Sequence, residues 1–185
     1  MVDLRKDDRG HWKRELEIPS ELWKQLLHET LQGIIALLDV VAEGLEDANP
    51  PRNRVIILAG IYTFALEECG KLLRLSHLSP NQGKVTIDYG AFRSHTVKFN
   101  DAIAALPPEC TNLRGGAFQR NAFQANAFQT GLLADFEARQ AIFYSDITET
   151  SDGIVQIPVV NLELLRTAAR SLREYAMNFQ IPKRA

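Results

Sequence analysis

Residues Arg52–Ser76 have the sequence RNRVIILAGIYTFALEECGKLLRLS, and the predicted fold is built outward from them. Val55, Tyr62 and Cys69 recur every seven residues, and apolar residues fill the positions between them at helical spacing. This pattern predicts an α-helix with an almost wholly apolar face. A second face also begins apolar, so we expect the helix to be buried between neighbours, where a charged side chain needs a partner. Four charged side chains lie near its C-terminal end: Glu67, Glu68, Lys71 and Arg74.

The composition is that of an ordinary soluble globular protein. Of the 185 residues, 45% are hydrophobic and 24% are charged, and the formal net charge of −2 predicts no overall attraction to nucleic acid or membranes. The two cysteines argue against a disulfide scaffold. The charged N-terminus has no signal-peptide core, and no apolar run approaches the ~20 residues of a membrane span. We therefore expect a cytoplasmic protein with no membrane contact.

Apolar spacing and proline breaks predict an all-α fold. Residues 1–17 are dense in charge and are predicted to form a flexible tail. Short connections, such as the one through Pro50 and Pro51, favour antiparallel neighbours. The prediction is a single domain over residues 18–181, an antiparallel helical bundle of four to five main helices. With Asp88 and Asn161 as N-caps, the helices are expected at about residues 20–46, 52–76, 88–106, 132–144 and 161–179.

Two of the predicted connections are unusual. Residues 109–131 contain the tripeptide Ala-Phe-Gln three times, at 117–119, 122–124 and 127–129. A five-residue repeat does not place its phenylalanines on one helical face, so we expect an irregular connection, with a partner-binding arm as the alternative. Before the last helix, Asp152 and Gly153 stand between two short β-compatible runs. They predict a small hairpin or extended loop over residues 145–158.

The charges on the central helix allow two interpretations. Glu67 and Lys71 are four residues apart in the favourable order for a salt bridge worth ~0.2–0.5 kcal/mol. One helical face is small or charged, so a neighbouring helix can approach it closely or a ligand can fit there: Gly60, Thr63, Glu67, Gly70 and Arg74. The first interpretation is a structural ion pair that joins two helices. The second is a polar pocket formed by four residues: Glu67, Glu68, Lys71 and His95.

His95 and Lys98 are the candidate catalytic residues, because they share one face of the third predicted helix. A ribonuclease needs a base for the 2′-hydroxyl group and a cation for the phosphate. His95 together with Lys98, Arg93 or Lys71 can supply both. The alternative is a surface or structural histidine. Arg93 lies about 200° around the helix from His95, and is a candidate binding residue of the polar centre.

Arginines on two later helices need their own explanation. Arg139 shares the apolar face of the fourth predicted helix, so it requires a carboxylate partner. The candidates for that partner are Asp146, Glu67 and Glu68. Three arginines line one face of the last helix, which we expect to be solvated rather than bound to phosphates: Arg166, Arg170 and Arg173.

Three short motifs in order carry a resemblance to a known family. Residues 65–71 are ALEECGK, residues 93–98 are RSHTVK, and residues 137–146 are EARQAIFYSD, followed by a polar turn and Pro158. This order resembles the AbiV-type abortive infection family, within the larger group of HEPN helical domains. The resemblance covers roughly residues 21–146. It implies a HEPN-like bundle, often dimeric, that defends bacteria against phage by shutting off gene expression.

The resemblance leaves the chemistry open. Many HEPN relatives are metal-independent ribonucleases with an Arg-x(4–6)-His motif, and that spacing is absent before His28, His77 and His95. Three hypotheses follow: an abortive-infection protein that binds a phage or host protein or RNA, an endoribonuclease using His95 and nearby cations, and a structural helical homodimer. No metal-ligand spacing or glycine-rich phosphate loop is seen, so no metal and no cofactor are expected.

Overall fold

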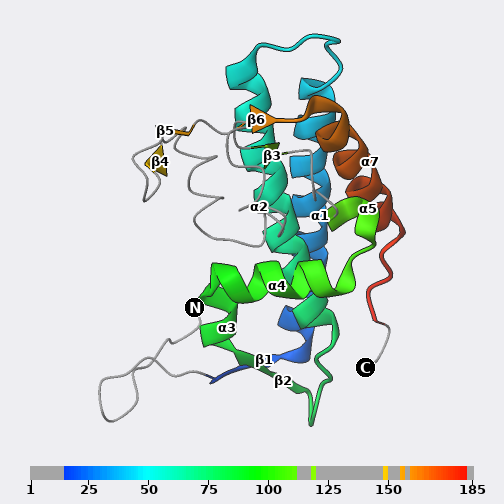
Figure 1. The fold of residues 1–185 in the computed structure, drawn as a ribbon. Coiled ribbons are helices and arrows are strands. Elements are labelled where there is room, and N and C mark those ends of the chain that lie inside the picture. The colour runs from blue at the N-terminus through cyan, green and yellow to red at the C-terminus, as the bar shows by residue number, and fades with distance from the viewer. Residues whose placement is uncertain (1–14, 112–117, 120–147, 150–154, 157–158, 183–185) are drawn as a thin grey trace.

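The computed structural model describes residues 15–111, 118–119, 148–149, 155–156 and 159–182 (Figure 1). This part of the chain is mostly helical, which confirms the all-α class at that level. Several predictions fall outside the described residues: the tail over 1–14, the helix at 132–144 with Arg139, most of the Phe repeat, and Asp146.

Helices α1 (Ser20–Gly44) and α2 (Arg52–Ser76) form an antiparallel pair. The predicted break at Pro50 and Pro51 separates them, since proline cannot continue a helix that precedes it. The indole Nε1 of Trp23 donates to the carbonyl oxygen of Leu75 at 2.9 Å, which ties the start of α1 to the end of α2. Figure 1 shows the two helices side by side through the middle of the molecule.

The main apolar face of α2 lies at the centre of the core. Val55, Tyr62 and Cys69 are all buried, as their spacing predicts. The second face differs from the prediction, because Ile57 and Phe64 are 62% and 38% exposed. Helix α2 is therefore buried on its main apolar face, while the face that carries Ile57 and Phe64 is partly exposed to solvent.

A two-stranded antiparallel sheet closes one end of the bundle and was not predicted. Strand β1 (Glu15–Pro19) pairs with β2 (Lys84–Asp88), so the last three residues of the predicted tail belong to a strand. Ile18, Val85 and Ile87 alternate with polar neighbours and are buried. The turn before β2 uses Gly83 at φ 75°, a conformation that favours glycine.

The third predicted helix is two helices. Asp88 caps α3 (Tyr89–Arg93) by accepting from the backbone N–H of Ala91, as predicted. The chain then becomes extended at Ser94, whose hydroxyl caps α4 (His95–Ala105) by accepting from the N–H of Val97. After α4 comes the short helix α5 (Pro108–Thr111). The serine cap makes His95 the first residue of α4, which decides where its side chain lies.

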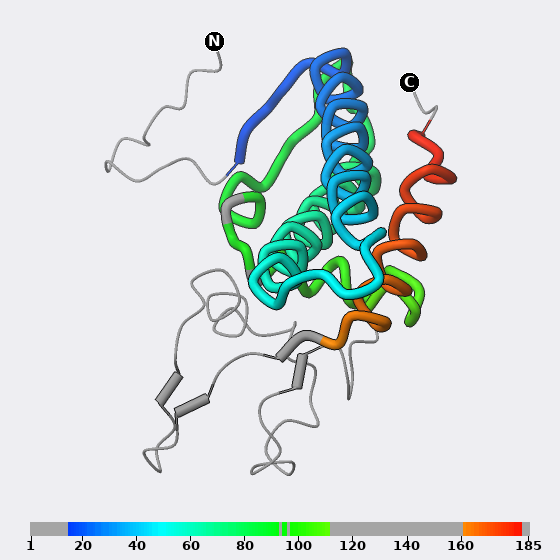
Figure 2. The backbone as a smooth tube through the Cα atoms, turned by 90° about the horizontal axis from the view of Figure 1, so that it is seen from above, coloured from blue at the N-terminus to red at the C-terminus, as the bar shows by residue number. Residues whose placement is uncertain are grey.

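Helix α7 (Leu162–Asn178) packs along α1 (Figure 2). Asn161 caps it as predicted, accepting from the N–H groups of Glu163 and Leu164. The arginine face differs from the solvated face that we expected. Arg166 donates to the carbonyl oxygen of Leu45, and its side chain is 22% exposed. Arg173 Nε lies 2.6 Å from an oxygen of Asp39, but its side chain is 42% exposed, and Arg170 is exposed too.

Short strands lie between α5 and α7 in the sequence. Strand β4 (Thr148–Glu149) pairs antiparallel with β5 (Val155–Gln156), which confirms the hairpin predicted for residues 145–158. Strand β3 (Phe118–Gln119), from the first copy of the Ala-Phe-Gln repeat, pairs with β6 (Val159–Val160). This pairing brings two distant parts of the chain together beside α2.

Helix α1 alone, among the described helices, is long and apolar enough by length and composition to cross a membrane. Its apolar side is occupied within the bundle, because Trp23, Leu27, Ile34 and Leu38 are fully buried in the core. A core helix passes the same composition test. Of the most apolar 18-residue window of α1, 33% is buried inside the bundle.

Candidate functional site

A buried glutamate at the interface of α2 and α4 binds two basic side chains. Glu67 on α2 has no exposed surface. Its Oε1 lies 2.5 Å from Nζ of Lys98 and 2.6 Å from Nδ1 of His95, both on α4. Lys98 is only 6% exposed, whereas the His95 side chain is 47% exposed. Glu67, His95 and Lys98 are called here the Glu67 cluster. Two of its side chains are buried, and the His95 imidazole is the part that reaches the surface.

The local sequence explains why His95 and Lys98 reach the same oxygen. Ser94 starts a new helix, and residues three apart on a helix lie on the same face. That face of α4 packs on the small and charged face of α2 that the sequence analysis identified. The interface continues beyond the cluster, since Nε of Arg74 lies 2.7 Å from Oδ2 of Asp101.

The salt bridge predicted between Glu67 and Lys71 is wrong. Lys71 instead pairs with Glu68 at 3.0 Å, and both side chains are partly exposed. Adjacent helical residues point about 100° apart, so Glu68 lies on the outer side with Lys71 while Glu67 points toward α4. Lys71 and Glu68 are therefore a separate pair beside the cluster.

The remaining predicted site residues have different outcomes. Arg74 lies on the α2–α4 interface as expected, with Asp101 as its partner. Asp101 was not among the predicted site residues, although its position three residues after Lys98 places it on the same face of α4. Arg93 ends α3, and its side chain is not among the described groups. Arg139 and Asp146 lie outside the described residues.

The contacts of the cluster hold the His95 imidazole in one orientation. Lys98 supplies the positive charge that a buried carboxylate requires. A carboxylate oxygen accepts hydrogen bonds, which places the proton of a neutral imidazole on Nδ1. Nε2 is then the basic ring nitrogen. A buried carboxylate that holds one nitrogen of a half-exposed imidazole is an arrangement suited to general-base chemistry.

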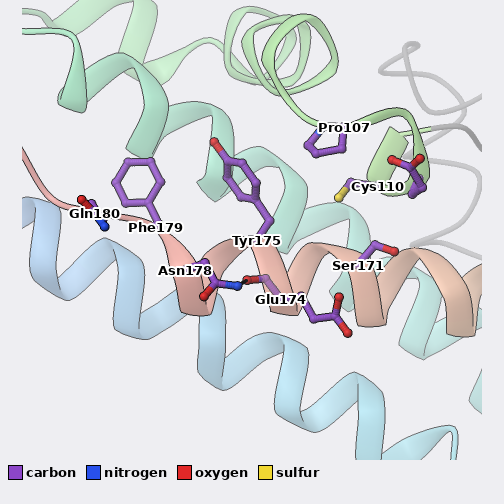
Figure 3. A pocket seen from close by; sticks show the side chains of 9 residues that line it. Pro107, Cys110, Ser171, Glu174, Tyr175, Asn178, Phe179 and Gln180 are labelled. Atoms are coloured by element: carbon purple, nitrogen blue, oxygen red, sulfur yellow. Dashed lines mark hydrogen bonds between the residues drawn. The ribbon is translucent and has the colours of Figure 1, made fainter.

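A second concave feature lies between α5 and α7 (Figure 3). It is an open groove of about 590 Å³, with Pro107 and Cys110 on one side and Tyr175 and Phe179 on the other. The hydroxyl of Tyr62 donates to the carbonyl oxygen of Cys110 beneath it, at 2.5 Å. Burial, followed by the charge of Glu109, raises the pKa of the Cys110 thiol to about 11, so this thiol is protonated and weakly reactive at neutral pH.

The described residues contain no group of three or more His, Cys, Asp or Glu side chains that could hold a metal ion. No protein-family model matches this chain, and neither a curated protein nor a solved structure is significantly similar to it. Functional assignment therefore depends on the Glu67 cluster and on the motifs quoted above.

Proposed function

We propose that this chain is a phage-defence protein of HEPN type, which shuts down gene expression by cleaving RNA without a metal ion at the Glu67 cluster. The observation that carries the proposal is a half-exposed imidazole held through Nδ1 by a fully buried carboxylate. The role in phage defence is proposed from the order of motifs that resembles the AbiV family. The cleavage chemistry is proposed from the contact between His95 and Glu67.

In this mechanism His95 is the general base. Its Nε2 removes the proton from a ribose 2′-hydroxyl group, and the 2′-oxygen attacks the adjacent phosphorus. The bond from phosphorus to the 5′-oxygen of the next nucleotide breaks, which leaves a 2′,3′-cyclic phosphate, and the departing 5′-oxygen takes a proton from water. Glu67 holds the ring in one orientation and stabilises the imidazolium as it forms. Lys98 is too buried to reach a phosphate, and its role is to neutralise Glu67.

The cation that faces the phosphate is assigned to Lys71. This side chain lies one helical turn after Glu67 on α2, and it is 25% exposed. Its partner Glu68 holds it by a partly exposed ion pair, which the proposal requires to open when a phosphate group binds. Lys71 thus replaces Lys98 as the phosphate-binding residue of the proposal.

Cleavage of RNA by the purified protein in the presence of a metal chelator tests the proposal. Wild type should cleave, and His95→Ala should lower the rate by about 10²-fold or more, the usual contribution of a general base. Glu67→Gln should lower it less, because the amide keeps one hydrogen bond to the ring. His28→Ala is the matched control, since His28 is exposed on α1. Cleavage that survives His95→Ala, or an inert wild type, contradicts the proposal.

A second candidate is a defence protein that binds a protein partner without catalysis. The observation that favours it is the exposure of Ile57 and Phe64 on one side of α2, 62% and 38% respectively. Phage protection should then be lost in Ile57→Asp with Phe64→Asp, and retained in His95→Ala. The opposite pattern supports the ribonuclease.

A further inference from the structure

Helices α2 and α4 approach each other closely at Gly70. A Cβ atom built on Gly70 would lie 1.7 Å from the carbonyl oxygen of Lys98 and 2.6 Å from its carbonyl carbon. It would also lie 3.2 Å from the backbone nitrogen of Ala102. Real Cβ atoms essentially never come within 3.0 Å of another group, so even the smallest side chain is excluded here.

The atoms that exclude a side chain at Gly70 all belong to the backbone. Such atoms cannot rotate away as a side chain can, so α4 would have to move as a unit. Two other helical glycines show the contrast. A Cβ on Gly44 meets only side-chain atoms of Leu58, and a Cβ on Gly33 meets nothing within 4 Å.

The close approach coincides with the Glu67 cluster. Gly70 lies three residues after Glu67, on the same face of α2. The residue whose carbonyl rests on Gly70 is Lys98, whose ammonium group binds Glu67. His95 lies on the same face of α4 and reaches the same oxygen. A shift of α4 away from α2 would therefore lengthen both contacts to Glu67 together.

We infer that Gly70 is a positioning residue, whose missing side chain sets the spacing of α2 and α4 at which Lys98 and His95 both reach Glu67. A role of Gly70 in catalysis rests on the proposed function. The claim that Gly70 sets the separation of α2 and α4 does not. Gly70→Ala should open the interface at Lys98 and separate the cluster. No side-chain substitution at Lys98 or Ala102 should restore it, because the obstructing atoms are backbone atoms.

Lysine labelling of the folded protein, followed by peptide mass spectrometry, tests this inference without RNA. In wild type, Lys98 should label far more slowly than Lys84, whose side chain is 64% exposed. In Gly70→Ala the labelling rate of Lys98 relative to Lys84 should rise about tenfold or more, because the lysine becomes locally accessible. RNA cleavage should fall in parallel if the proposed function is right.

Two glycine variants separate positioning from general destabilisation. Gly33→Ala and Gly44→Ala should leave the relative labelling rate of Lys98 unchanged, although Gly44→Ala is expected to lower the melting temperature. Unchanged Lys98 labelling in folded Gly70→Ala overturns the inference. If Gly70→Ala does not fold, the substitution is repeated together with Gly33→Ala. Gly33→Ala should stabilise α1, because alanine has a higher helix propensity than glycine. Failure to fold there also overturns the inference, since Gly70 would then be a folding requirement. If wild type does not cleave RNA but Lys98 labelling still rises in Gly70→Ala, the packing claim is supported and only the proposed function is rejected.

Discussion

Nζ of Lys98 lies 2.5 Å from Oε1 of Glu67, and both side chains are buried between α2 and α4. Two opposite charges removed from water together stabilise each other, but each one alone in the interior is costly. The pair therefore makes the α2–α4 interface sensitive to the loss of either partner.

Removal of one partner should cost more than removal of both. Lys98→Met removes the ammonium group that lies closest to the buried Glu67 carboxylate and should lower the free energy of unfolding by about 3–5 kcal/mol. The double variant Glu67→Leu with Lys98→Met should recover most of that loss, because no buried charge remains. Urea denaturation followed by circular dichroism measures both. A double variant less stable than Lys98→Met would show that the loss of the Lys98 charge beside Glu67 is not the main cause.

Arg166 should stabilise the junction of α1 and α7. Its guanidinium group donates to the carbonyl oxygens of Leu45 and Asp47, which follow the last turn of α1. Arg166→Ala should therefore lower the free energy of unfolding by about 1–3 kcal/mol, since the part-buried carbonyl oxygen of Leu45 loses a charged donor. Arg170→Ala, at an exposed position on the same helix, is the control and should change stability by less than ~0.5 kcal/mol.

The hydrogen bond between Trp23 and Leu75 gives a third prediction. Trp23 is fully buried, and Trp23→Phe removes the indole donor to the Leu75 carbonyl oxygen while leaving a small void. The expected loss is about 2 kcal/mol or more, from the unsatisfied acceptor and the lost packing together. A lowered melting temperature in a thermal scan would show it. Leu22→Ala, one residue earlier but exposed, should have little effect.

Stability should fall in alkaline solution because of the Cys110 thiol. Its pKa is raised from 9.0 to about 11 in the folded protein, chiefly by burial. Between those two values the unfolded chain loses a proton that the folded protein keeps, so ionisation favours unfolding as pH rises. This stability contribution is complete below pH 9.0 and is lost progressively up to about 11. The slope is about 1.4 kcal/mol per pH unit for one thiol.

Comparison of wild type with Cys110→Ala isolates that thiol. The alanine variant keeps the backbone carbonyl of residue 110, so the hydrogen bond from the Tyr62 hydroxyl is preserved. Its melting temperature should decline less steeply over the same pH range. Parallel curves for the two proteins would assign the alkaline loss to other groups, such as Tyr62 and Cys69, whose pKa values burial also raises.

Local features were predictable because short stretches of sequence specify them. The prolines after α1, the caps at Asp88 and Asn161, and the apolar spacing of α2 fixed four helix boundaries close to those observed. The hairpin signal at Asp152 and Gly153 also predicted the pairing of β4 with β5. In each case the deciding interaction lies within a few residues along the chain.

The tertiary structure decided which partner each charge received. The sequence placed Glu67, His95 and Lys98 among the candidates, but it favoured Lys71 as the partner of Glu67 because helical neighbours are the only contacts a sequence displays directly. The observed partner is on another helix, 28 residues away at His95. Its approach depends on the split at Ser94 and on the absence of a side chain at Gly70. The pairing of β1 with β2 was missed for the same reason, since it joins segments that only the folded chain brings together.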